Sequence, residues 1–222
     1  VEKGNEVNFT ADITTGTEYN GAPCSVSQSL YMSEPYQFTV DAAIMSEYTN
    51  TSFALWFKVE KFEHASLGTL LMTKVNRNHD TNGASWTDNV WGEMWTAIRP
   101  EGYAAKNNIG RNNAPNELSL STDGPRAGTP NYEHNNDVDI LSDGYSLMPG
   151  VWYHVCAVKA GKELQLYLNG KLIASGTSRG RGPYNWKNGA KFYVGGSMTN
   201  LASLTGWVDE VQIWSKALSE AE

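Results

Sequence analysis

Apolar and polar positions alternate along many short segments of this chain, and Gly, Pro, Asn and Asp residues separate these segments. Alternation with a period of two indicates a β-strand with one buried face, and short strands at regular spacing are typical of a sandwich or barrel. The segments predicted as strands are Ser27–Tyr31, Phe38–Asp41, Ser52–Glu60, Leu67–Lys74, Glu93–Ile98, Glu117–Ser121, Val151–Lys159 and Lys191–Val194. Long amphipathic helices do not alternate with these strands, which excludes a nucleotide-binding α/β fold.

The clearest local element is a hairpin in which Glu163–Leu168 and Lys171–Ser175 flank Asn169 and Gly170. The Asn-Gly pair accepts positive φ at both turn positions, as a type I′ turn requires. The best helical candidate is Lys216–Glu222 at the end of the chain. The sequence therefore predicts an all-β fold with one short terminal helix.

Composition and charge narrow the function classes. The 222 residues include eight Trp, eleven Tyr and six Phe, which is enough apolar material for one all-β domain over 1–222. A net charge of −7 disfavours sequence-independent binding to nucleic acid or to an anionic membrane. No apolar run spans a bilayer, and the first residues are not a signal peptide, so we expect a domain excised from a larger secreted or surface protein.

The two cysteines, Cys24 and Cys156, lie 132 residues apart, which excludes a CxxC metal or redox motif. They either form one long-range disulfide or are ordinary buried small side chains. The redox compartment therefore cannot be read from the cysteines.

Four motifs follow one another in the last third of the chain. They are Gly150–Val158 with a Trp-x-His-Val pattern, Leu166–Lys171 with Leu-Tyr-x-Asn-Gly-Lys, Tyr193–Gly196 with a Gly-Gly end, and Gly206–Trp214 with Asp-Glu-Val, followed by Ala217–Glu220. In this order they resemble the laminin-G-like jelly-roll family of the concanavalin A-like lectin/glucanase superfamily. Phe53–Val59 resembles an earlier strand of that family, whereas the family's early Phe-Asp-Gly segment is not recognisable.

This resemblance implies a two-sheet antiparallel β-sandwich, a concanavalin A-like jelly roll of roughly a dozen strands with long loops. It also implies binding of a glycan or a protein, often with a structural Ca²⁺. Modules of this kind are found in surface proteins that capture glycans, including those of gut bacteria. An extracellular or cell-surface location, on the bacterial outer surface for example, and neighbouring domains in the same chain are therefore expected.

The carboxylates do not form a recognised glycosidase motif. Many glucanases of this fold carry Glu-x-Asp-x-x-Glu on one strand, which places a nucleophile and an acid on one face. Asp209 and Glu210 are adjacent and are expected on opposite faces, while Asp137 and Asp139 lack a following Glu. Gly176–Gly180 matches Gly-x-Ser-x-Gly literally, but no helix follows the serine, and His154 is expected as a packed strand residue. The sequence thus favours binding over catalysis.

Three long polar stretches, 76–91, 99–116 and 123–143, and the Gly- and Asn-rich context of Tyr184 and Trp186 contain the candidate ligand residues. Aromatic rings stack on the apolar faces of sugars, and guanidinium groups bond to hydroxyls. The candidate glycan ligands are Trp86, Trp91, Arg99, Tyr103, Tyr184 and Trp186. Each aromatic alternatively packs on the core beneath its own loop. Trp56, Trp152, Trp207 and Trp214 lie inside strand patterns and are interpreted as core or sheet-face packing.

Calcium is the only cofactor expected, and its candidate ligands are acidic. They are Asp209, which matches the closing motif of the family, and Asp137, Asp139 and Asp143 in the most acidic stretch. This stretch is not an EF-hand, because Gly144 and Met148 occupy the wrong positions. The alternatives are a solvated loop, and for Asp209 a strand-end hydrogen bond.

Three functions follow from these observations. The first is a non-catalytic module that binds an oligo- or polysaccharide. The second is a structural or adhesion domain that binds protein, and the third is a glycoside hydrolase or lyase with unrecognised carboxylates. The failed search for paired carboxylates places the glycan-binding module first.

Overall fold

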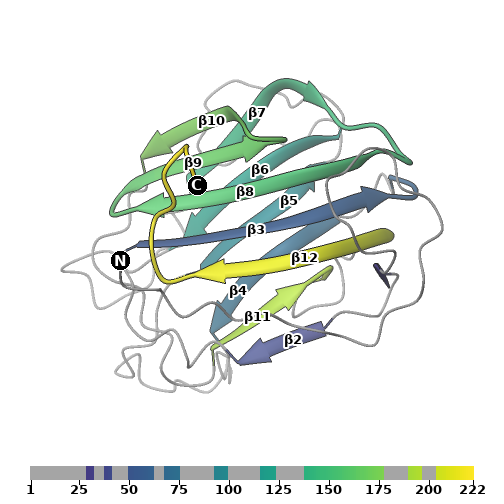
Figure 1. Cartoon of the computed structure of the whole chain (residues 1–222), viewed down its shortest axis with the longest axis horizontal. Helices are drawn as coiled ribbons and strands as arrows, with labels where there is room; N and C mark the ends of the chain where they lie inside the picture. The colour runs from purple at the N-terminus through teal and green to yellow at the C-terminus, as the bar shows by residue number, and fades with distance from the viewer. Residues whose placement is uncertain are drawn as a thin grey trace, which may run out of the picture.

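The computed structural model describes residues 29–32, 38–41, 50–62, 68–75, 93–99, 116–123, 138–177, 190–196 and 204–222. Within these ranges, twelve strands form two antiparallel sheets of six strands each. Sheet A lies in front of sheet B in Figure 1, so the two sheets form the layers of a sandwich. The all-β sandwich predicted from the sequence is confirmed. No helix in the described ranges is long and apolar enough to cross a membrane.

Sheet A has the order β1 (Leu30–Met32), β12 (Gly206–Trp214), β3 (Asn50–Val59), β8 (Trp152–Ala160), β9 (Glu163–Leu168) and β10 (Lys171–Thr177). Sheet B has the order β2 (Phe38–Asp41), β11 (Ala190–Val194), β4 (Gly68–Val75), β5 (Glu93–Arg99), β6 (Glu117–Asp123) and β7 (Val138–Ser146). Strands distant in sequence, such as β3 and β12, are neighbours because the chain crosses between the sheets, as in a jelly roll.

The core fills the space between the two sheets. Alternate residues of β3, namely Phe53, Leu55 and Phe57, are at most 2% exposed and pack in one cluster with Leu120 of β6 and Phe192 of β11. Burying each of these side chains contributes about 1.5–3 kcal/mol. The other face of β3 therefore points away from the core, because successive strand residues point to opposite faces.

The predicted Asn-Gly hairpin joins β9 to β10. Asn169 has φ 50° and Gly170 has φ 76°, as a type I′ turn requires. Leu164, Leu166 and Leu168 are buried, in agreement with the predicted alternation. At the other end of β10, a Cβ added to Gly176 would lie 2.5 Å from Cγ2 of Ile140 in β7, so the two sheets approach closely at this edge.

The stretch 123–143 was interpreted as an acidic loop, but its last residues belong to a strand, and 124–137 lie outside the described residues. Val138–Ser146 form β7, in which Asp139 pairs with Ser121 and Ile140 with Leu120 of β6. Ile140 is buried within β7, and Leu147 is buried directly after the strand. The acidic residues among them obscured the strand in the sequence pattern.

The predicted helix at Lys216–Glu222 is wrong, because this segment contains bends and a turn only. Its backbone bonds to sheet A instead: Ser52 Oγ donates to the Lys216 carbonyl at 2.9 Å, and the Leu218 amide donates to Ser52 Oγ at 2.9 Å. Lys216 and Glu222 also form an ion pair. Seven residues are too few for a stable helix unless packing supports it, and these hydrogen bonds hold the segment in an irregular path along sheet A. We call Ser215–Glu222 the C-terminal segment.

Candidate functional site

The outer face of sheet A, the side away from sheet B, has two different halves. At the Ser52 end of β3 the C-terminal segment crosses the sheet, as Figure 1 shows, and Ser52 and Val158 are at most 2% exposed. At the other end, β3 places Trp56 and Lys58 on this face, because Leu55, Phe57 and Val59 point into the core. The second half carries a group of aromatic side chains that the C-terminal segment leaves uncovered.

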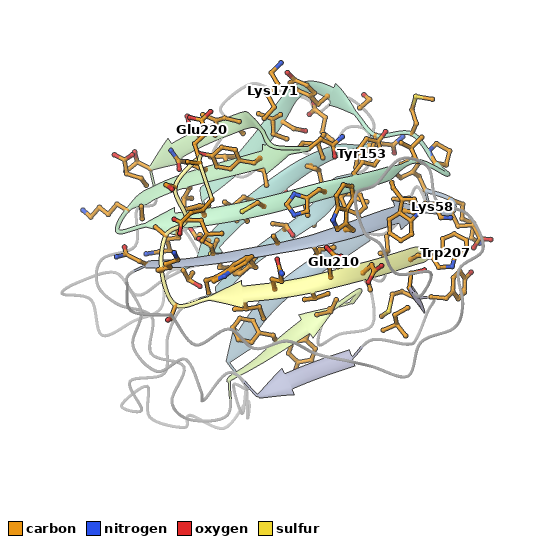
Figure 2. The ribbon with its side chains drawn as sticks, viewed as in Figure 1. Lys58, Tyr153, Lys171, Trp207, Glu210 and Glu220 are labelled. Carbon is orange, nitrogen blue, oxygen red and sulfur yellow. The ribbon has the colours of Figure 1, made fainter. Side chains whose placement is uncertain are left out.

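We call Tyr31, Trp56, Trp152 and Trp207, together with Lys58 and His154, the aromatic cluster. Cross-strand pairing brings them together, because Trp207 lies opposite Lys58 and Lys58 lies opposite Trp152. The Lys58 Nζ atom is 4.4 Å from the centroid of the Trp207 ring and 5.3 Å from that of Trp152. Figure 2 shows Lys58 and Trp207 side by side at one end of their strands. The ammonium group therefore faces two indole rings, which attract it electrostatically.

Tyr31 forms the rim of the aromatic cluster. Its ring meets that of Trp207 edge to face, with 5.0 Å between the centroids. Its hydroxyl donates to Oε2 of Glu60 at 2.5 Å, and this bond, helped by burial and by the carboxylate charge, raises the pKa of Tyr31. The side chain is 38% exposed, so an aromatic surface with a polar edge is open to solvent here.

Behind this rim, Trp56 lies opposite His154 of β8, and their ring centroids are 5.1 Å apart. Burial lowers the pKa of His154, so the imidazole is neutral at neutral pH. Asn169 of the hairpin turn accepts from the His154 amide at 2.8 Å and donates its own amide to the His154 carbonyl at 2.8 Å. The strand that carries Trp152 and His154 is thereby fixed against the hairpin.

A β-bulge changes the faces of the two carboxylates on β12. Asp209 pairs with Trp56 and Gln212 with Ala54, so two residues of β12 lie opposite Leu55 alone. Val208 and Val211 both pack against the core, which leaves Asp209 and Glu210 on the outer face together. The prediction of opposite faces is therefore wrong, because regular alternation does not continue through a bulge.

The local geometry of the bulge is unusual. Glu210 has φ 46°, a conformation that glycine adopts readily but side-chain-bearing residues rarely do. Its amide donates to Oδ1 of Asp209 at 2.8 Å, so Asp209 accepts a hydrogen bond at the bulge inside β12 and not at a strand end. Burial raises the pKa of Asp209, partly offset by this hydrogen bond, while the Glu210 charge raises it further. Glu210 is exposed, and Asp209 is partly buried.

Most of the candidate ligands predicted from the sequence lie outside the described residues. They are Trp86, Trp91, Tyr103, Tyr184, Trp186 and Asp137. The backbone of Arg99 ends β5 opposite Glu117, and Asp139 and Asp143 lie on β7. These residues are not brought together with the aromatic cluster by any described strand pairing, and their roles stay predictions.

The described part of the chain places no three His, Cys, Asp or Glu side chains where they would hold a metal ion. Calcium takes six to eight oxygen ligands, and the cross-strand partner of Asp209 is Trp56, whose side chain supplies none. Asp209 thus has no described ligand set, and calcium stays a prediction. Cys156 is a free cysteine, and burial raises its pKa to about 11, while Cys24 lies outside the described residues.

The sequence had indicated sheet-face packing for Trp56, Trp152 and Trp207, and the structure confirms it. It had not placed these residues in a candidate site, because their grouping depends on the pairing of three strands. Two signals were nevertheless present: the Trp-x-Lys pattern of β3 and the Trp-x-His pattern of β8 both place paired side chains on one face.

Comparison with known proteins supports the motifs of the last third of the chain. A laminin G family model, described as concanavalin A-like lectin/glucanases superfamily, matches residues 73–222, which is more than half of the chain. The chain belongs to this superfamily. No curated protein sequence matches the chain.

Several solved structures have the same fold as this chain, although their sequence identity to it is low. Domain 4 of an extracellular arabinanase from Geobacillus stearothermophilus, in complex with arabinotriose, is 16% identical with a TM-score of 0.57, over 98% of this chain and 84% of that one. The CBM40 of the Ruminococcus gnavus IT-sialidase, bound to α2,3-sialyllactose, is 14% identical with a TM-score of 0.55, over 87% and 92% of the two chains.

A putative carbohydrate-binding protein from Bacteroides ovatus is 17% identical with a TM-score of 0.53. The match covers 87% of this chain and 44% of that chain, so the likeness extends over less than half of the longer protein. At these identities the three structures establish the fold only.

Proposed function

We propose that this domain is a non-catalytic carbohydrate-binding module of a secreted or cell-surface protein. The observation that carries the proposal is the partly exposed Tyr31–Trp207 pair on the open half of sheet A. Carbohydrate-binding domains stack sugar rings on such aromatic planes and bond the hydroxyls at the polar edge. Glu60 provides an acceptor at this pair, and Asp209 and Glu210 provide further acceptors along β12, where Asp209 is the partner of Trp56.

The superfamily and the titles of the structural neighbours support the same proposal. Two of the three neighbours were solved with a bound oligosaccharide, one of them a domain of an extracellular enzyme, and the third is a putative carbohydrate-binding protein. The loop aromatics and Arg99 remain part of the proposal as additional glycan contacts. An oligo- or polysaccharide is the partner, with neighbouring domains in the parent chain.

A glycan array followed by titration calorimetry tests this function. Trp207→Ala and Tyr31→Ala should each weaken binding of any glycan bound by the wild type by about tenfold or more. Leu172→Ala is the matched control, because Leu172 is a 41% exposed apolar residue at the opposite edge of sheet A. Trp86→Ala, Trp91→Ala and Trp186→Ala separate the contribution of the loops.

Two results would overturn the proposal. The first is no binding to any glycan, with Ca²⁺ or with a chelator present. The second is that the wild type releases reducing ends from mixed polysaccharides and that this activity is lost in Asp209→Asn or Glu210→Gln. Such a result would make the domain a hydrolase. Thermal unfolding with Ca²⁺ and with chelator tests the calcium prediction at the same time, since a bound ion stabilises the folded state.

A further inference from the structure

The fold leaves open which class of glycan the aromatic cluster takes. Among the structural neighbours, one was solved with arabinotriose, a neutral sugar, and another with sialyllactose, which carries a carboxylate. The charges around the cluster distinguish these two classes, because they act on any sugar that stacks on Trp207.

The single described cation within the cluster is already engaged. The Lys58 ammonium lies over the rings of both Trp152 and Trp207, at 5.3 and 4.4 Å from their centroids. A ligand anion would have to draw this ammonium away from two indole faces, both of which attract it electrostatically. Lys58 is therefore poorly placed to neutralise a sugar carboxylate.

Three carboxylates lie beside or along this face of sheet A: Glu60 bonds to Tyr31, Asp209 pairs with Trp56, and Glu210 follows Asp209 at the bulge. Glu60 accepts a hydrogen bond from the Tyr31 hydroxyl at one rim, and Asp209 lies two residues along β12 from Trp207 on the same face. The bulge adds Glu210 to this face, and Figure 2 shows its position along β12 from Trp207. A carboxylate is an acceptor only, so it suits the hydroxyl donors of a neutral sugar and repels another anion.

Building on the proposed function, we propose that the aromatic cluster selects neutral, hydroxyl-rich glycans and excludes glycans that carry carboxylate or sulfate groups. Glu210 determines this selectivity. Glu210 has this role because it is the exposed one of the two β12 carboxylates, and because its side chain reaches this face through a backbone with φ 46°. Glu60 is also exposed, but its Oε2 already accepts a hydrogen bond from Tyr31. The net charge of −7 acts in the same direction at long range.

The test compares matched neutral and acidic ligands on the whole domain: galactan with polygalacturonate, and lactose with sialyllactose, together with neutral arabino-oligosaccharides. The wild type should bind at least one neutral ligand, and it should bind acidic ligands at least about tenfold more weakly at low ionic strength. High salt should narrow the difference by screening the carboxylates.

Glu210→Gln keeps the side-chain shape and removes the charge. It should reduce the discrimination between neutral and acidic ligands by about threefold or more. Glu163→Gln is the matched control, because Glu163 is also exposed but begins β9 at the far end of sheet A, opposite Ala160. This control should leave the discrimination unchanged, and thermal unfolding should show that both variants are folded.

The outcomes separate the two proposals. Absence of binding to both classes overturns the proposed function. Three other results would overturn the selectivity of the aromatic cluster while the domain remains a carbohydrate-binding module. They are a preference for acidic glycans, equal effects of Glu210→Gln and Glu163→Gln on the discrimination, and neutral-glycan binding that survives Trp207→Ala.

Discussion

The Lys58 ammonium lies 4.4 Å from the centroid of the Trp207 ring, and the two residues are cross-strand partners on the outer face of sheet A. The same ammonium lies 5.3 Å from the Trp152 ring. One lysine therefore links β12 and β8 across β3. Its charge and its aliphatic chain both contribute to the packing of the aromatic cluster.

Replacing Lys58 with Met should lower the free energy of unfolding by about 1 kcal/mol, because the aliphatic packing is kept and both cation–π contacts are lost. Lys58→Arg should retain most of the stability, since guanidinium also stacks on indole. Urea unfolding checks both values. Lys171→Met, which loses one contact at 5.2 Å to Tyr145, is the control and should have a smaller effect. Equal losses in the two Met variants would contradict this interpretation.

Gly206→Ala should be among the most destabilising single substitutions in the described chain. A Cβ at this position would lie 2.0 Å from the Lys58 carbonyl oxygen, so β12 would have to move away from β3. We expect a loss of about 3 kcal/mol or more. Gly150→Ala, where nothing lies within 4 Å but φ is 77°, should lose only about 1 kcal/mol. A similar midpoint of thermal unfolding for both variants would show that β12 can move away from β3 at little cost in stability.

Ser52→Ala should release the C-terminal segment, because Ser52 Oγ bonds both to the Lys216 carbonyl and to the Leu218 amide. The expected loss is about 1–2 kcal/mol. Cys156 lies opposite Ala54 on the same face, so its thiol should react faster with a thiol reagent once the segment is free. The rate is measured in a Cys24→Ser background. An unchanged rate would show that the segment does not protect this thiol.

Lys159 should make stability depend on pH. The side chain is 3% exposed, and burial lowers the pKa of its amine from 10.5 to about 8. Between these two values the unfolded chain holds a proton that the folded chain has released, so this group makes the free energy of unfolding rise with pH. Below pH 8 its unfavourable contribution is fully present.

Lys159→Met should therefore stabilise the domain by about 2 kcal/mol at neutral pH, with the lost hydrogen bond to the Gly161 carbonyl offsetting part of the gain. The gain should fall toward zero above pH 10.5. Urea unfolding at several pH values gives the difference in free energy of unfolding between variant and wild type. The contributions of Cys156 and the tyrosines cancel in this difference, because both proteins contain them. Lys162→Met, at an exposed turn position, is the control. A gain that does not vary with pH would contradict the burial argument.

Local pattern was sufficient to predict most of the fold. The Asn-Gly hairpin and the alternation of β3 and β8 depend on neighbouring residues, and the structure has them as predicted. The terminal helix failed because tertiary hydrogen bonds to Ser52 decide the path of a segment too short to be helical alone. β7 was missed because its acidic residues interrupt the apolar pattern that marks a strand.

The candidate site was harder to predict from the sequence than the fold. The aromatic cluster depends on register, since Lys58 meets Trp207 and Trp152 only when β12, β3 and β8 pair as they do. The bulge at Asp209 and Glu210 has no glycine to signal it, so a regular strand was the natural expectation. The loop residues predicted as ligands lie outside the described ranges, and the sequence remains the basis for their role.

The bulge also shows that Glu210 is an insertion in an otherwise regular strand. Val208, Val211 and Ile213 face the core, and Asp209 and Gln212 face outward, so removing position 210 alone would restore unbroken alternation. Val211 would then pair with Leu55, and the rest of β12 would keep its partners. The architecture could be built with one residue fewer, and the extra residue adds a carboxylate to the surface without being needed for the sandwich.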